Sequence, residues 1–347
     1  MTTKQNPEVT VLMPVYNGEK YLKEAMISIL NQSFQDFEFI IINDASTDNS
    51  AEVIKQFDDK RIRYFENSEN LCLSRTLNKG LNLSKGNYVA RMDQDDISLL
   101  DRLEKQLNFL ENNKEYGICG SFIENFGAKE GIEIYPVIDE LIRIHLLFYS
   151  TFAHPSVMFR KSFFEKFNLF YNSEFEYCED YDLWSRAKKH FKLANINEVL
   201  LKYRVHSTGM SVVGKNKQDK MADFVRNNQL KDIGINSNSE ELRIHHSLIC
   251  NMFENSDEYV NAVEKWLLKL IEGNKTYNIY DKKTFHEFLG KFWFEVIKLR
   301  LDTGLKCWKK YIGSELRKSI YNNKNTRKIF FRALINEFKN FLGGTCV

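Results

Sequence analysis

The sequence lacks the features that would place the protein in a membrane or outside the cell. No apolar run approaches the ~18 residues that a membrane-spanning helix requires. The N-terminus, Met1 to Glu8, is polar and has no apolar core of a secretory signal. The six cysteines are scattered without a C-x-x-C pair, which argues against a structural zinc site and for reduced thiols. We therefore expect a soluble, cytoplasmic protein.

The near-zero net charge names no binding partner. It excludes a protein whose whole surface is strongly acidic or strongly basic. The 49 Lys and Arg residues against 47 Asp and Glu residues leave a net charge of +2, so there is no strongly acidic or basic whole-protein field. No repeat or low-complexity tract is visible. A chain of 347 residues with 43% hydrophobic content is long enough for two domains with sizeable cores.

Strand-like and helix-like patterns alternate over the first hundred residues. Their spacing predicts an α/β fold with a doubly wound, mixed but mostly parallel sheet. Such sheets bind ligands beyond the carboxyl ends of their strands, where Asp44 and Asp93 each follow a predicted strand. The predicted strands are Val9–Met13, Phe37–Ile42, Ile62–Phe65 and Tyr88–Met92, and the predicted helices are Tyr21–Asn31, Ala51–Phe57 and Leu73–Leu83.

The sequence pattern changes beyond about residue 215, where amphipathic helical segments dominate and few strand signals remain. Asn255 with Glu258 resembles a capping box, and Gly273 is a plausible helix stop. We therefore predict an α/β domain over residues 1–215 and a mainly α-helical domain over residues 216–347. The helices expected in the second domain are residues 217–232, 240–254, 258–272 and 283–301.

Three carboxylates occupy four positions directly after the apolar run Tyr88–Met92. Because residues i and i+2 of an extended chain point to the same side, Asp93 and Asp95 can converge on one point. Their repulsion, roughly 1–4 kcal/mol, would be relieved by a cation such as Mg²⁺ or Mn²⁺, which prefers oxygen ligands. The alternative is a solvated acidic turn that caps a helix beginning near Ser98.

Four separated motifs occur in a fixed order over about residues 8–210. They are Pro14-Val15-Tyr16-Asn17, Asn43-Asp44-Ala45-Ser46-Thr47-Asp48, the run 78–106 and Glu179-Asp180. Together they resemble the motifs of family 2 glycosyltransferases, which are inverting enzymes with the GT-A fold, common in bacterial surface-polysaccharide synthesis. The sequence departs from the family at Asn43-Asp44-Ala45, where many members carry Asp-Asp-Gly.

The resemblance implies roles in binding a UDP-sugar. Asp44 would read the base by accepting a hydrogen bond from the uracil N–H, with a simple helix N-cap as the alternative. Asp93 and Asp95 would hold the ribose and a metal on the diphosphate, with Asp95 the more direct ligand. A structural ion pair is the alternative for Arg91. The other residues implied on the nucleotide-sugar side are Pro14, Tyr16, Asn17, Arg75, Arg91 and Gln94.

The segment Tyr203-Arg204-Val205-His206 is placed by the resemblance on a loop over the diphosphate. His206 would then be a third metal ligand or a hydrogen-bond donor to phosphate, and Arg204 a charge clamp suited to phosphate. A lone histidine is more often structural, and His154 stays open between the two interpretations.

The pair Glu179-Asp180 is the candidate for catalysis. By resemblance, Asp180 is the general base that takes the proton of the acceptor hydroxyl, and Glu179 flanks the donor sugar or the acceptor. The alternative is an acidic first turn of a helix, stabilised by the helix dipole. The dipole would lower the pKa of Asp180, whereas the neighbouring carboxylates would raise it, and the sequence does not decide between them.

These inferences lead to the prediction of an inverting hexosyltransferase that uses a UDP-sugar and Mn²⁺ or Mg²⁺. Its acceptor is expected to be a saccharide, free or lipid-linked. A catalytically inactive nucleotide-sugar-binding or scaffold protein is the alternative, and a nucleotidyltransferase is disfavoured because the N-terminal loop lacks a Gly-rich phosphate motif.

The C-terminal tail is strongly basic. From Lys298 to Val347, twelve Lys and Arg stand against three Asp and Glu, and residues 327–335 mix basic with bulky apolar side chains. This pattern is typical of an amphipathic helix on an anionic membrane, or of a basic helix packed on its own domain. No nucleic-acid-binding motif accompanies it. Apolar helical faces in residues 240–340 also leave a homodimer open.

Overall fold

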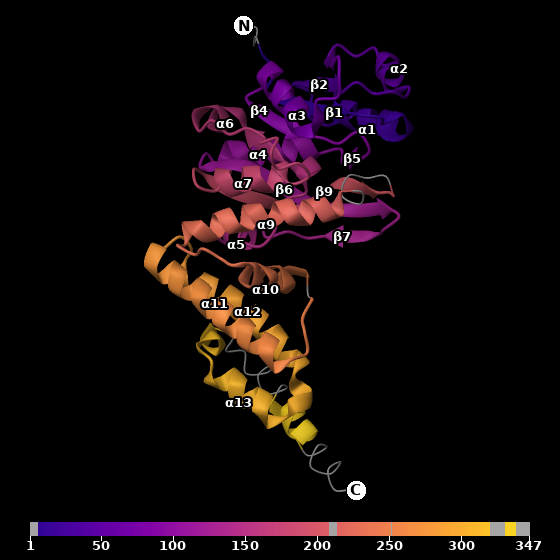
Figure 1. Cartoon of the computed structure of the whole chain (residues 1–347). Coiled ribbons are helices and arrows are strands. Elements are labelled where there is room, and N and C mark those ends of the chain that lie inside the picture. Colours follow the sequence, from indigo (N-terminus) through magenta and orange to yellow (C-terminus); the bar gives the residue numbers. More distant parts are fainter. Residues whose placement is uncertain (1–5, 208–213, 251, 320–329, 338–347) are drawn as a thin grey trace. The chain divides into compact units, whose positions relative to one another are not determined.

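The computed structural model describes residues 6–207, 214–250, 252–319 and 330–337 (Figure 1). Contacts divide the chain into two compact units, residues 1–146 with 150–225 and residues 147–149 with 226–347. The division falls within helix α9 (Lys215–Asp232), whose start coincides with the domain boundary predicted from the sequence.

The described strands all belong to one mixed sheet in the first unit. Its strand order is β3-β2-β1-β4-β8-β6-β9-β5, with β7 paired to β6. Strand pairs β1–β2, β1–β4, β2–β3 and β6–β9 are parallel, and β4–β8, β5–β9, β6–β7 and β6–β8 are antiparallel. The strands are β1 (Val9–Val15), β2 (Phe37–Asn43), β3 (Ile62–Glu66), β4 (Tyr88–Arg91), β5 (Ile97–Ser98), β6 (Tyr116–Gly127), β7 (Gly131–Glu133), β8 (Met158–Arg160) and β9 (Lys192–Val205).

Helices cover both faces of this sheet, which confirms the predicted α/β class. Alternate residues of β1 point to opposite faces, so Val11 packs with the buried side chains of α1 and α4, and Leu12 packs with those of α3 and α7. The helices of this unit are α1 (Glu19–Leu30), α2 (Ser50–Lys55), α3 (Cys72–Leu83), α4 (Arg102–Asn112), α5 (Asp139–Leu146), α6 (Lys161–Lys166) and α7 (Glu179–Ala187), with the short 3₁₀ helix η1 (His154–Ser156).

The carboxyl ends of β1, β2 and β4 lie side by side, as the parallel pairing requires. The backbone N–H of Asp44 donates to the carbonyl of Val15 at 2.7 Å, and that of Met92 donates to Leu12 at 3.0 Å. The loops that follow these three strands therefore leave the sheet at one edge, and this edge carries the candidate site.

One helix start differs from the prediction. The helix expected near Ser98 begins at Arg102, because Ile97 and Ser98 form β5 and pair with Lys202 and Leu201 of β9. The acidic turn therefore leads into a strand, and it does not cap a helix.

The second unit is helical in its described residues. It holds the end of α9 together with α10 (Ser239–Cys250), α11 (Asp257–Tyr277), α12 (Lys282–Leu299), η2 (Leu301–Thr303), α13 (Leu305–Gly313) and η3 (Glu315–Ser319), and residues 330–337 are also helical. Among the described residues, no helix combines the length and the apolar character that crossing a bilayer requires.

Both predicted ends of α11 are wrong. Its cap is Ser256 and not Asn255, since the Ser256 hydroxyl accepts the N–H of Tyr259 at 3.0 Å. Gly273 lies inside the helix, which continues to Tyr277 and ends at Asn278 in the left-handed conformation, with φ 52°.

Candidate active site

Two loops at the carboxyl edge of the sheet are tied together by Gln94. Its side-chain amide accepts the N–H of Tyr16 at 2.8 Å and donates to the carbonyl of Tyr16 at 2.9 Å. Pro14 is buried within β1, whereas Tyr16 and Asn17 are exposed at the edge. Asn17 in turn accepts the N–H of Thr47 at 2.8 Å, so the loops after β1, β2 and β4 form one framework.

Asp44 is buried in this framework and is not the cap of α2. Its Oδ1 accepts hydrogen bonds from the Asn67 side chain at 2.6 Å and from the N–H of Leu71 at 2.9 Å. Asp48 instead accepts the first N–H of α2, that of Ser50, at 3.0 Å. The second oxygen of Asp44 makes no hydrogen bond within the described residues, so it is available to a donor on a ligand.

Asp93, Asp95 and Asp96 gather their carboxylates within 4.8 Å of one another. Asp96 is only 1% exposed, and its Oδ2 has no hydrogen-bond partner in the described part of the chain. Burial, and then the charges of Asp93 and Asp95, raises the pKa of Asp96 well above its usual value. A buried, unpartnered oxygen beside two more carboxylates suits a hard divalent cation, so the residues present fit Mn²⁺ or Mg²⁺.

The end of β9 closes over this acidic cluster. The Arg204 backbone N–H donates to Asp96 Oδ1 and its Nε donates to the carbonyl of Asp95, both at 2.8 Å. His206 Nε2 lies 2.8 Å from Asp95 Oδ2. The Arg204 guanidinium also pairs with Glu24 and lies 4.3 Å from the ring centre of Tyr21, so it is well fixed.

Arg91 connects the acidic cluster to the start of α7. It is 3% exposed and forms an ion pair with Asp93, the alternative role considered from the sequence. Its charge also opposes the burial-driven rise in the pKa of both Glu179 and Asp180. The end of β4 and α7 are linked through η1, since the Arg91 backbone N–H donates to the carbonyl of Val157 at 2.9 Å and the His154 ring lies 6.1 Å from that of Trp184 in α7.

The start of α7 carries two adjacent carboxylates, with Glu179 buried and Asp180 half-buried. Burial, and then the charge of Asp180, raises the pKa of Glu179 to about 7. Burial also raises the pKa of Asp180, although the N–H of Tyr181 at the helix terminus acts in the opposite direction. The Ser150 hydroxyl donates to Asp180 Oδ2 at 3.2 Å. The sequence left open whether the pKa of Asp180 is raised or lowered. It is raised, because desolvation outweighs the effect of the helix N-terminus.

Two other candidates lie differently. Arg75 is exposed on α3 and makes no ion pair with any described residue, so nothing ties it to the cluster. His154 is held 3.0 Å from the Tyr171 hydroxyl, and burial together with the charge of Arg91 keeps its pKa well below the usual value. A neutral histidine beneath Arg91 favours the structural interpretation.

Sequence reasoning missed three residues of the site, and one of them, Asp96, was noted only as part of the acidic run. Ser150 precedes its partner by 30 residues and has no local signal. Arg102 is fully buried beneath the cluster, where its guanidinium donates to the carbonyl of Arg91 at 2.7 Å. The helix that begins with Arg102 also carries apolar core residues. An arginine at the start of such a helix could have signalled this buried role.

Comparisons with known proteins identify the family of this chain. The sequence model of Glycosyl transferase family 2 matches residues 10–171. An uncharacterized glycosyltransferase of Haemophilus influenzae is 31% identical over 283 residues, which is 73% of this chain and 88% of that protein. The O-antigen biosynthesis glycosyltransferase WbnJ of Escherichia coli is 36% identical over 214 residues, which is 57% of this chain and 80% of WbnJ.

Solved structures with the same fold include S. aureus TarS 1–349 in complex with UDP-GlcNAc. The match covers 93% of this chain and 90% of that chain, with a TM-score of 0.55 and 14% sequence identity. At this identity the likeness shows the fold alone, and that fold is the GT-A fold expected from the sequence.

Proposed function

The chain belongs to glycosyl transferase family 2, and from this premise we propose that it is an inverting, metal-dependent hexosyltransferase. It transfers a hexose or N-acetylhexosamine from a UDP-sugar to a saccharide hydroxyl, giving a β-linkage from an α-linked donor. A relative named for O-antigen biosynthesis and a neighbour solved with UDP-GlcNAc support this donor and a role in surface-polysaccharide synthesis.

One observation carries the proposal: a single buried cation, Arg91, acts on two acidic groups of different kinds. It pairs with Asp93 of the candidate metal cluster, and its charge acts on Asp180 at the start of α7. A transferase needs the leaving diphosphate and the attacking hydroxyl on opposite sides of one anomeric carbon. In this proposal the cluster with Asp93 faces the diphosphate, and Asp180 faces the attacking hydroxyl.

Asp180 acts as the general base. The Ser150 hydroxyl holds its Oδ2 and so fixes the orientation of the carboxylate. The acceptor hydroxyl gives its proton to Asp180 while its oxygen bonds to the anomeric carbon, and the bond from that carbon to UDP breaks. A raised pKa strengthens a carboxylate as a base near neutral pH, and Glu179 beside it orients the sugar or the acceptor.

The donor is bound by the loops that Gln94 ties together. The second oxygen of Asp44 accepts the uracil N–H, while Tyr16 and Asn17 line the exposed edge beside the base. Arg204, fixed beside the acidic cluster, supplies positive charge toward the diphosphate, and the exposed side chain of Arg75 turns toward it when the donor binds. Asp95, Asp93 and His206, together with the buried Asp96, would hold Mn²⁺ or Mg²⁺, which, when bound, neutralises charge on the departing UDP.

The acceptor is a saccharide hydroxyl, free or on a lipid carrier at the cytoplasmic face of the membrane. Of the predicted membrane-binding segment 327–335, residues 327–329 lie outside the described residues. Phe331 and Ile335 of the described helix are 58% and 53% exposed, which supports contact of the tail with an anionic membrane.

Asp180→Asn tests the assignment of the base. Turnover of the preferred UDP-sugar should fall about 10²–10⁴-fold while UDP binding is retained, since the variant loses only the proton acceptor. Asp182→Asn is the matched control on the same helix, because the Asp182 carboxylate pairs with Arg186 instead. Near-normal turnover in Asp180→Asn would show that another group is the base.

The same assay tests the function itself. A panel of UDP-sugars with Mn²⁺ and a saccharide acceptor should release UDP from the wild-type protein. A scaffold would bind a UDP-sugar and release none, and that result would overturn the proposed activity.

A further inference from the structure

A second pocket lies in the first unit, at the other end of the sheet from the candidate active site. It opens where β6 and β9 begin, between α6 and the end of α7, and has a volume of about 440 Å³. Lys192 of the pocket begins β9 and Arg204 lies 12 positions further along it, so at about 3.3 Å per residue the two lie roughly 40 Å apart. The pocket is therefore distinct from the site that binds the donor.

The pocket is more cationic than the rest of the chain. Arg143, Lys166, Lys189 and Lys192 line it against one carboxylate, Glu115, for a formal charge of +3, which exceeds the +2 of the whole sequence. Lys192 lies only loosely beside Glu115, at 3.5 Å. Lys166 makes no ion pair with any described residue, and its ammonium lies 5.1 Å from the ring centre of Phe167.

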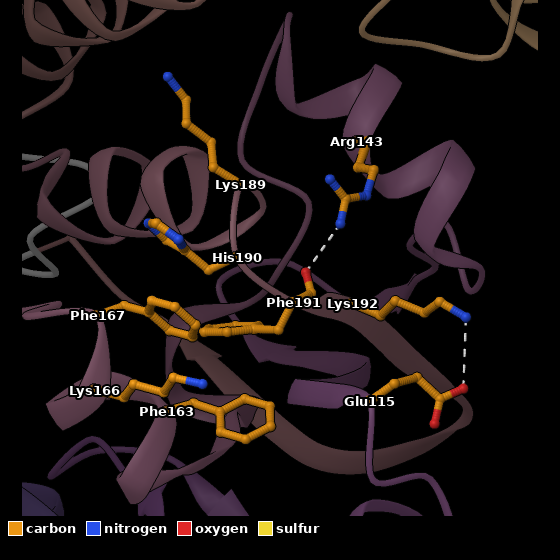
Figure 2. A pocket seen from close by; sticks show the side chains of 9 residues that line it. All are labelled: Glu115, Arg143, Phe163, Lys166, Phe167, Lys189, His190, Phe191 and Lys192. Atoms are coloured by element: carbon orange, nitrogen blue, oxygen red, sulfur yellow. Dashed lines mark hydrogen bonds and ion pairs between the residues drawn. The ribbon is translucent and has the colours of Figure 1, made fainter.

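Aromatic rings form the floor between these cations. Figure 2 shows Phe191 at the centre of the pocket, with His190 above Phe167 on one side and Lys166 below. His190 and Phe167 stack with centroids 4.3 Å apart, and Phe163 lies 5.3 Å from Phe191. The ligand that fits must therefore offer an apolar surface as well as negative charge.

Hydrogen bonds from the Arg143 side chain and the small size of Gly117 hold the pocket in shape. Arg143 pairs with Asp139 at 2.6 Å and donates to the carbonyls of Lys188 and Phe191, the latter at 3.0 Å, so it fixes the turn that carries the stacked histidine. Gly117 of β6 leaves the space for Phe191, since a Cβ there would lie 2.3 Å from its ring. These constraints preform the aromatic floor, which lowers the entropic cost of binding.

We propose that this pocket binds a phosphorylated ligand that carries an apolar group. Lys166, Lys192 and His190 contact the phosphate, and the half-buried rings of Phe163 and Phe167 contact the apolar part. This chemistry is shared by the phosphate headgroup of an anionic lipid and by a soluble phosphorylated molecule.

Titration of the full chain with monomeric dihexanoyl phosphatidic acid tests the pocket. Lys166→Gln with Lys192→Gln should weaken binding about tenfold or more, because two of the cations are lost. Lys55→Gln with Lys275→Gln is the matched control, since both lysines are exposed and pair with a glutamate on their own helix. Its effect should be below about twofold.

Two further measurements distinguish binding in this pocket from binding at other anion sites of the protein. Saturating UDP should leave the affinity for phosphatidic acid unchanged, and inorganic phosphate should bind at least about tenfold more weakly because it lacks the apolar group. Four outcomes would each overturn the proposal. They are no binding of phosphatidic acid, equal losses of affinity in the two double-lysine variants, competition by UDP, and inorganic phosphate binding as tightly as phosphatidic acid.

Vesicles distinguish the two sources of ligand. If the wild-type protein sediments with phosphatidic acid vesicles and the Lys166/Lys192 variant does not, the membrane is the source of the ligand. Binding of the monomeric lipid without vesicle capture identifies a soluble phosphorylated ligand. Either outcome supports the pocket, since both depend on the same lysines.

Discussion

Ala45, in the loop after β2, is an alanine held in the left-handed region with φ 58°. This conformation costs an L-residue roughly 1–2 kcal/mol, and glycine escapes that cost at the expense of some unfolded-state entropy. Ala45→Gly, which restores the residue common in relatives, should therefore stabilise the protein by about 0.5–1 kcal/mol. Urea unfolding measures this difference in free energy.

Ala51→Gly provides the matched control in the helix that follows. Ala51 is within α2, where glycine should destabilise by about 1 kcal/mol. If both substitutions destabilise equally, the loop after β2 does not hold Ala45 in the left-handed conformation.

Glu179 makes stability depend on pH. Burial and the nearby Asp180 raise its pKa from 4.5 to about 7, so the folded protein binds its proton more tightly than the unfolded chain does. Stability from this group is therefore fully present below pH ~4.5 and lost as pH rises toward about 7. At ~1.36 kcal/mol per pKa unit, the loss is on the order of 3 kcal/mol.

Glu179→Gln should remove this dependence, since glutamine stays neutral. Relative to the wild type, the variant should gain on the order of 3 kcal/mol more at pH 8 than at pH 5, measured by urea unfolding at both. Glu174→Gln makes the same change at an exposed position nearby. An equal pH dependence in the wild type and Glu179→Gln would contradict the assignment.

At the scale of elements, Gly273 shows how packing can reverse a helix propensity. Replacing glycine by alanine inside a helix ordinarily stabilises by about 1 kcal/mol. A Cβ at position 273 would lie 2.6 Å from the backbone oxygen of Ile233, so Gly273→Ala should instead destabilise by about 1–3 kcal/mol. Gly313→Ala, where no atom lies within 4 Å, should be neutral or stabilising. Thermal unfolding of both variants decides, and a gain in both would mean that α11 does not pack closely against the turn at Ile233.

The elements differ in how far the sequence predicts them. The apolar run of β2 is buried along its whole length and was predicted because a parallel central strand has no polar face. β6 and β9 were not predicted, because their burial is interrupted along the strand and their pairing contains register shifts. The end of α11 was misplaced for a different reason, since Gly273 serves a tertiary contact that a local pattern does not contain.

At the scale of the whole molecule, the candidate site is predictable where its residues are neighbours in sequence. Asp93 and Asp95 converge because extended backbone repeats every two residues, and the resemblance supplied their context. The contact of Arg204 with Asp96 spans 108 positions, so the closure of β9 over the cluster depends on the folded sheet. The raised pKa of Glu179 likewise comes from burial, which no local motif specifies.

The two-unit organisation allows the metal proposal to be tested without measuring turnover. All described strands belong to the first unit, so the strand signal in far-ultraviolet circular dichroism reports on the unit that holds the acidic cluster. UDP with Mn²⁺ at about 100 times the dissociation constant should stabilise that signal by ~2.7 kcal/mol, because ligand binds only the folded unit. Chelation with EDTA, or Asp95→Asn, should remove most of this gain, whereas Asp58→Asn at an exposed position should keep it. A gain that survives both EDTA and Asp95→Asn would mean that UDP binds without the metal, and the acidic cluster would then need another role.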